Sequence, residues 1–128
     1  MYDIKISDFK VGQKAFVELD GNASRGKKRN ELIEEWVIIS VGRKYVTAKP
    51  MTGIYEIKFK PHDASYGGLI QVTKYCVDYI LYPNEEMIKN KLEKEDLVRW
   101  FKTAFNGFDN NSKYSLEQLR EAKNTLIN

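Results

Sequence analysis

The sequence predicts an α+β fold, in which a small antiparallel, SH3-like β-barrel is followed by a C-terminal helical hairpin. Over residues 1–82, short segments rich in β-branched and aromatic residues alternate with polar turns, which is typical of a small barrel or curled sheet. After Pro83 the apolar residues fall at helical spacing. The 128 residues, 42% of them apolar, suffice for one modest core. We therefore expect a body (1–82) and a helical tail (83–128) packed on it as one structural domain.

Three strands are expected at the start of the body. Residues 14–19 alternate between polar and apolar side chains, which is typical of a half-buried strand. Residues 34–41 are apolar on both faces and indicate a central strand, and residues 45–49 return after a turn at 42–44. Residues 20–30 are polar and contain two glycines, so we expect a long loop there.

Two further strands are expected in the second half of the body. Residues 54–60 place Tyr55, Ile57 and Phe59 on one face and charged side chains on the other. A slip of one residue would expose all of these apolar side chains, so the register is strongly set. Residues 73–81 alternate again and predict another strand.

The tail is expected to begin with a helix. Asn84 is a good N-cap, and the two glutamates that follow it favour the helix dipole. The apolar rhythm is interrupted between Leu92 and Leu97, so we expect a kink or a short break near residues 93–95. The helix is expected to end with Gly107 in the left-handed conformation.

A second helix is expected from Ser115. Ser115 and Gln118 match the capping-box pattern, and Tyr114 can form a hydrophobic staple with Leu119. The helix then carries a narrow apolar stripe of Leu116, Leu119, Ala122 and Leu126. Because so short a helix is marginal alone in water, it must dock on the longer helix, on the barrel or on a partner.

The composition indicates a protein of the cytoplasm, in the cytosol of a host cell. Cys76 is the single cysteine, which excludes an internal disulfide and fits a reducing compartment. The longest apolar run, residues 36–39, is too short to span a bilayer. Residues 1–5 lack the basic and then apolar order of a signal peptide.

The chain offers little for catalysis. His62 is the only histidine, and with Asp63 it is interpreted as part of a polar loop rather than as a metal-binding or general-base pair. Cys76 is interpreted as a structural or surface residue. Residues 21–28 have the glycine and lysine spacing of a P-loop, but Lys28 stands where the metal-binding Ser or Thr would be. We therefore expect no enzyme, no metal site and no cofactor.

A basic stretch is the main candidate for binding a partner. Residues 1–82 carry 13 Lys and Arg against 10 Asp and Glu, so they hold all of the net charge of +3. Four of these cations cluster in the predicted loop, at Arg25, Lys27, Lys28 and Arg29. They can contact phosphates and make binding salt-dependent, or they can form a merely solvated loop. Arg43 and Lys44 extend the cluster if the two turns lie at the same end of the barrel.

Aromatic residues add two further candidates. Tyr45 and Tyr55 offer stacking surfaces for bases, although Tyr55 is also a candidate core residue. Arg99 and Trp100 are a possible second interface on the tail, because both residue types are common anchors of interfaces. The alternative is that Trp100 packs the helix on the barrel.

Three segments carry a resemblance to a known group of proteins: residues 6–13 (ISDFKVGQ), 41–47 (VGRKYVT) and 114–120 (YSLEQLR). They resemble small β-barrel accessory proteins of phages that infect Firmicutes, a group without an assigned active site. The resemblance implies a phage or prophage gene. It also implies an anti-defence role, because small proteins of that kind often bind and disable a host machine such as a CRISPR effector.

Three functions are compatible with these features. The first is stoichiometric inhibition of a host nucleic-acid-handling defence complex, with a host protein or nucleoprotein complex as partner. The second is an SH3-like module that binds DNA or RNA directly. The third is the sequestration of a small signalling nucleotide. The sequence leaves the identity of the partner and the oligomeric state open.

Overall fold

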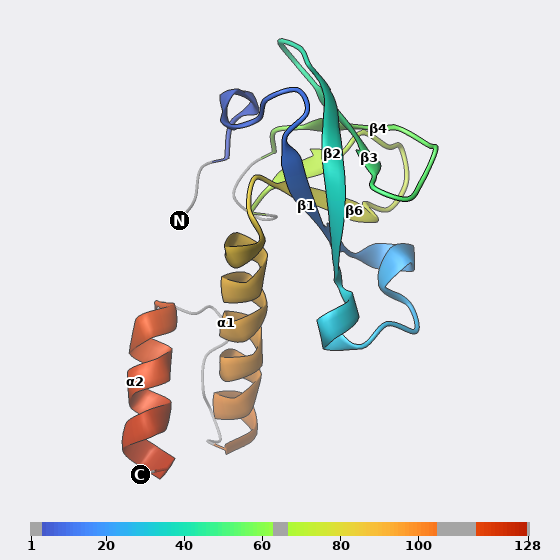
Figure 1. Cartoon of the computed structure of the whole chain (residues 1–128). Coiled ribbons are helices and arrows are strands. Elements are labelled where there is room, and N and C mark those ends of the chain that lie inside the picture. Colours follow the sequence, from blue (N-terminus) through green and yellow to red (C-terminus); the bar gives the residue numbers. More distant parts are fainter. Residues whose placement is uncertain (1–3, 63–66, 105–114, 128) are drawn as a thin grey trace. The chain divides into compact units, whose positions relative to one another are not determined.

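The structure, a computed structural model, describes residues 4–62, 67–104 and 115–127 of the chain (Figure 1). The chain forms two compact units, Met1–Ile88 and Lys89–Asn128. The boundary between them falls inside a helix, α1 (Glu85–Ala104). The packing of the tail on the body as one structural domain stays a prediction.

The first unit contains a closed barrel of antiparallel strands. Its strands are β1 (Lys14–Leu19), β2 (Ile33–Val41), β3 (Val46–Pro50), β4 (Ile57–Lys60), β5 (Leu69–Gln71) and β6 (Tyr79–Tyr82). Each strand pairs with the next, and β1 also pairs with β6, so that Phe16 lies opposite Tyr82. The α+β class and the antiparallel barrel are confirmed, whereas the SH3-like type stays a prediction.

Alternate residues of the strands fill the barrel, as predicted for residues 14–19. Trp36 on β2 is fully buried, and its ring lies 6.0, 5.9 and 5.2 Å from the rings of Tyr55, Phe59 and Tyr79. Edge-on and tilted pairs of this kind add about 0.5–1.5 kcal/mol each beyond the area that they bury. Other side chains of the strands that are almost fully buried are Ala15, Val17, Ile38, Val46, Ala48, Leu69, Ile80 and Leu81.

β4 is shorter than the predicted strand 54–60. It begins only at Ile57, and Ile54 is 97% exposed. The ladder between β3 and β4 ends where Ala48 pairs with Ile57. Pro50 follows close behind on β3 and has no N–H to continue a ladder. The expectation that Tyr55 belongs to the core is wrong in part, because its side chain is 48% exposed although its ring contacts Trp36.

The predicted strand over residues 73–81 is wrong for its first part. The alternating segment is the connection between β5, which was not predicted, and the short β6. Backbone donors in this connection bond to side chains instead of a neighbouring strand. Tyr75 N donates to Thr73 Oγ1 at 3.1 Å, and Asp78 N donates to Gln71 Oε1 at 3.0 Å.

α1 starts as predicted, since Asn84 Oδ1 accepts a hydrogen bond of 3.0 Å from a backbone N–H of the first turn. The expected break near residues 93–95 is wrong, because the helix is continuous there. Leu92 and Leu97, on either side of the interrupted rhythm, are both buried without a break in the helix. The expected end at Gly107 lies outside the described residues.

α2 (Leu116–Ile127) begins after Ser115, as predicted. Three buried side chains, Leu97, Phe101 and Leu119, form the core of the second unit. The short helix therefore docks on the longer helix, which is one of the three expected alternatives. Tyr114 and the side chain of Leu126 lie outside the described part of the chain. Neither described helix is long and apolar enough to cross a membrane.

Candidate nucleic-acid interface

The four clustered cations lie on the connection between β1 and β2. Arg25, Lys27, Lys28 and Arg29 are all exposed. We call these four residues the basic loop. The connection that carries it contains two short 3-10 turns (Figure 1). Gly21–Ser24 precedes the basic loop, and Arg29–Glu31 begins at its last residue.

The first of these turns is fixed to the connection between β5 and β6. Asp78 accepts two backbone hydrogen bonds of 2.8 Å, one on its carboxylate from Asn22 N and one on its carbonyl from Asp20 N. Gly21 lies so close that a Cβ there would be only 2.6 Å from Asp78 Oδ1 and from Cys76 Sγ. Its φ of +48° is also a conformation that favours glycine. The basic loop therefore starts from an anchored base.

Nearby carboxylates partly offset the positive potential of the basic loop. Glu31 Oε1 accepts a hydrogen bond of 3.3 Å from Lys28 N, and Glu34 Oε1 accepts one of 3.1 Å from Trp36 Nε1. Glu35 lies 3.9 Å from the ammonium of Lys14. Glu31 and Glu34 keep their negative charges in these hydrogen bonds, because the donors are neutral N–H groups. The side chains of the basic loop are exposed.

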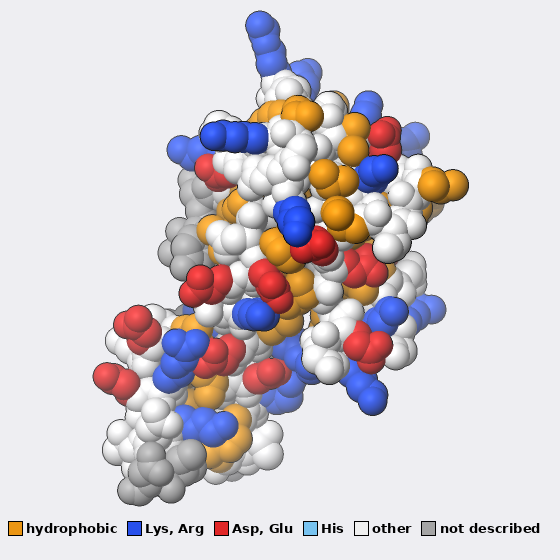
Figure 2. Space-filling model, viewed as in Figure 1, with side chains coloured by type: hydrophobic (Ala, Val, Ile, Leu, Met, Phe, Trp, Pro, Cys, Tyr) orange, Lys and Arg blue, Asp and Glu red, His pale blue; other side chains and the backbone are white. Residues whose placement is uncertain are grey.

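Arg43 and Lys44 do not extend the basic loop. Successive turns of an antiparallel sheet alternate between its two ends, and the nine residues of β2 separate these two by roughly 26 Å at 3.3 Å per step. This exceeds the screening length of about 10 Å. Figure 2 accordingly shows Lys and Arg side chains both at the tip of the β2–β3 hairpin and over the connection between β1 and β2. The condition for a single patch, that both turns lie at the same end of the barrel, is therefore not met. The role of either cluster in binding stays a prediction.

The hairpin tip has neighbours that the sequence analysis did not connect with it. Val46 and Phe59 are buried and pair across β3 and β4, so the alternate residues point outward. We call the outward set, together with the tip, the basic sheet face: Arg43, Lys44, Tyr45, Lys49, Lys58 and Lys60. The alternation of residues 54–60 already placed two of these lysines opposite the apolar face. Only the pairing with β3 brings them beside Tyr45.

The end of the barrel that carries the basic loop also holds two tyrosines. Burial raises the pKa of Tyr79 to about 12, helped by a hydrogen bond with Tyr55 and by the negative charges of Glu34 and Asp78. A phenol with this pKa stays neutral at physiological pH. The two tyrosines are thus linked by a hydrogen bond beside the aromatic core around Trp36.

The possible second interface lies on α1. Arg99 bonds to Asp96 at 3.1 Å, and Trp100 packs against the core of the second unit, with Lys123 Nζ 5.1 Å from its ring centre. Trp100 thus serves the packing within the helical unit. A role of these residues in binding a partner stays a prediction.

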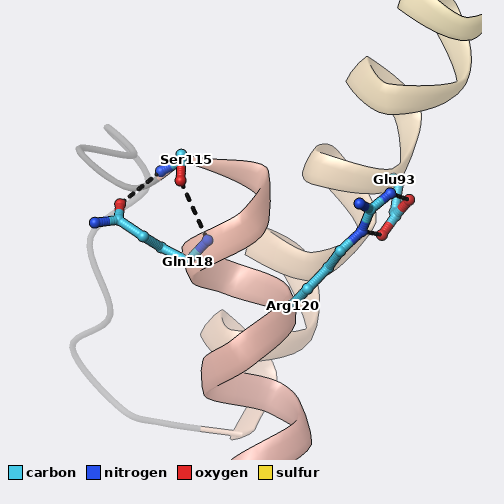
Figure 3. Close-up of polar contacts among 4 residues, drawn as sticks. All are labelled: Glu93, Ser115, Gln118 and Arg120. Atoms are coloured by element: carbon cyan, nitrogen blue, oxygen red, sulfur yellow. Dashed lines mark hydrogen bonds and ion pairs between the residues drawn. The ribbon is translucent and has the colours of Figure 1, made fainter.

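The second unit is held by polar contacts at two places (Figure 3). Arg120 on α2 forms a two-pronged ion pair with Glu93 on α1. The predicted capping box is confirmed, since Ser115 N donates to Gln118 Oε1 at 2.8 Å and Gln118 N donates to Ser115 Oγ at 3.2 Å.

The described residues contain no group of three or more His, Cys, Asp and Glu that could hold a metal ion. His62 is exposed, and its neighbour Asp63 lies outside the described residues. Cys76 is exposed, with Sγ 3.7 Å from the carbonyl of Val77. The absence of enzymatic activity stays a prediction.

Comparison with known protein families gives a match over nearly the whole chain. The profile of the family described as phage ProQ C-terminal-like domain matches residues 1–127. Neither a curated protein nor a solved structure matches the chain. The phage association that the resemblance implied is confirmed, and the anti-defence role stays a prediction. Since the match covers nearly the whole sequence, the chain belongs to the phage ProQ C-terminal-like domain family.

Proposed function

We propose that this protein is a phage accessory protein that binds RNA through contacts between its basic loop and phosphates. Two points support the proposal. ProQ, from which the family takes its name, is an RNA-binding chaperone. The basic loop presents four exposed cations on a frame that backbone hydrogen bonds anchor to Asp78. This anchored cationic loop is the observation that carries the proposal.

The anchoring matters for affinity. A loop that is already ordered loses less conformational freedom on binding, so more of the interaction energy appears as affinity. Contacts to phosphates release counterions, and the binding constant falls with salt by a slope of about −0.7 per phosphate for single strands. Four contacts from the basic loop would thus contribute a slope of about −3.

The test is a fluorescence anisotropy titration of a labelled 12-nucleotide RNA across a salt series. One variant carries glutamine at Arg25, Lys27, Lys28 and Arg29. The matched control carries glutamine at four lysines of α1, namely Lys89, Lys91, Lys94 and Lys102. Both variants lose four positive charges, so a difference between them reports the position of the charge and not the net charge.

We expect the loop variant to bind more weakly than the parent and to have a salt slope smaller by about 3. The control is expected to stay close to the parent. The proposal is wrong if the parent does not bind RNA at 50 mM salt, or if the loop variant and the control behave alike.

The other two functions predicted from the sequence, inhibition of a host defence complex and sequestration of a signalling nucleotide, stay predictions. RNA binding does not exclude the first, because a nucleoprotein complex also presents phosphates. A bare RNA titration separates the two ideas, since an inhibitor that recognises only a protein surface would show no affinity for RNA alone.

A further inference from the structure

The outer face of β3 and β4 is rich in cations. Thr47 pairs with Lys58 across the two strands, and Lys60 follows on the same face, about 7 Å further along. Both lysines are exposed. In the described part of the chain, Arg43, Lys44 and Lys60 form no ion pair. Among the described residues, the charges of these three side chains are therefore not used in an ion pair.

An aromatic ring lies within this cationic surface. Tyr45 directly precedes the inward-facing Val46, so its side chain points outward, and it is 39% exposed. Lys58 Nζ lies 5.7 Å from the ring centre, within the range of a cation–π contact. Because the ammonium lies over the ring, it steadies the ring and occupies one of its two faces, so a stacked base needs the other face.

We propose that the basic sheet face binds single-stranded RNA, with one base stacked on Tyr45 and the flanking phosphates held by Arg43, Lys44, Lys58 and Lys60. This inference rests on the proposed RNA-binding function. It adds a second binding site and the requirement that the bound RNA is single-stranded. Every base has a π-face, so stacking of this kind tolerates any sequence. The lysine spacing of about 7 Å along β4 suits the phosphates of an extended strand.

The same geometry disfavours a duplex. In A-form RNA the bases are stacked on each other, and the major groove is too deep and narrow for side chains to read. Tyr45 needs a base that is free of its neighbours. A strand held in this way passes over the outside of the barrel, at the end opposite the basic loop.

The experiment compares three variants in the same RNA titration. Tyr45→Ala removes the ring, Tyr45→Phe keeps it without the hydroxyl, and Tyr75→Ala removes a tyrosine that is 88% exposed on the connection between β5 and β6. We expect Tyr45→Ala to weaken binding roughly 5- to 150-fold, the range measured when one stacked base is lost. Tyr45→Phe and Tyr75→Ala are expected to stay within about twofold of the parent.

A second measurement separates stacking from charge. Tyr45→Ala removes no charge and is expected to leave the salt slope unchanged. Replacing Lys58 and Lys60 together by glutamine is expected to reduce the slope by about 1.4. RNA labelled with 2-aminopurine should lose fluorescence on binding the parent, because stacking quenches this base, and should keep most of it on binding Tyr45→Ala.

The outcomes distinguish this inference from the proposed function. If the basic-loop variant loses affinity and Tyr45→Ala does not, the inference is wrong and RNA binding by the loop stands. Equal affinity for a duplex and a single strand of the same length also overturns the inference. If the parent binds no RNA, both proposals fail. Circular dichroism of each variant confirms that the barrel is folded.

Discussion

Replacing Gly21 by alanine should destabilise the barrel unit much more than replacing Gly26. Both glycines have positive φ, +48° and +73°, so an alanine at either position adopts a left-handed conformation. That conformation costs about 1–2 kcal/mol. About 0.4–1 kcal/mol of it is returned because alanine restricts the unfolded chain. The backbone effect alone therefore predicts a loss of about 1 kcal/mol at each position.

Packing distinguishes the two positions. A Cβ on Gly26 would meet nothing within 4 Å, whereas one on Gly21 would lie 2.6 Å from Cys76 Sγ and 2.8 Å from the carbonyl of Val77. Forcing an extra carbon into a packed site costs about 1–3 kcal/mol. We therefore expect a loss of about 2–4 kcal/mol for Gly21→Ala and about 1 kcal/mol for Gly26→Ala.

The free energy of unfolding is measured by urea titration of the parent and both variants, followed by tryptophan fluorescence. Gly26→Ala is the matched control, because it lies in the same connection and has the same kind of backbone conformation. Equal losses for the two variants would refute the packing between Gly21 and residues 76–78. The RNA affinity adds a second readout, since Gly21→Ala displaces the base of the basic loop without changing its charge.

Two further predictions concern pH. The pKa of Tyr79 is raised to about 12, so its contribution to stability is complete below pH 10 and is lost as the pH rises through 12. Absorbance titration at 295 nm should show a component near pH 12 that is smaller by one tyrosine in Tyr79→Phe. An unchanged component in that variant would contradict the assignment to Tyr79. The hydrogen bond from Arg120 lowers the pKa of Glu93, so this pair stabilises the helical unit above the ordinary glutamate pKa of about 4.3. This stabilisation is lost as the pH falls through the lowered pKa that Glu93 has in the folded protein. The difference in melting temperature between the parent and Glu93→Gln should accordingly be present at pH 7 and absent at pH 2, and a constant difference would contradict the assignment.

Local patterns predicted those elements whose partners are close in the sequence or whose alternation is regular. β1, the cap at Asn84 and the capping box at Ser115 depend on neighbouring residues, and each is confirmed. The strand over 73–81 failed because alternation alone does not show where the backbone donors go. Thr73 and Gln71 offer side-chain acceptors there, and these end the ladder.

The candidate site was predictable only in part, for a similar reason. The basic loop was visible because its four cations are close in the sequence. The basic sheet face was not, because Tyr45 and Lys58 are 13 positions apart and meet only through the pairing of β3 with β4. The two clusters would have formed one patch only with both turns at the same end of the barrel, and consecutive turns emerge at opposite ends of an antiparallel sheet.

The pairing of β1 with β6 has a consequence for how the protein is made. Because Phe16 on β1 pairs with Tyr82 on β6, a chain emerging from the ribosome cannot complete its sheet until more than sixty further residues have been synthesised. Contacts between such distant positions slow folding. During that interval the N-terminal strand is open to pairing with other chains.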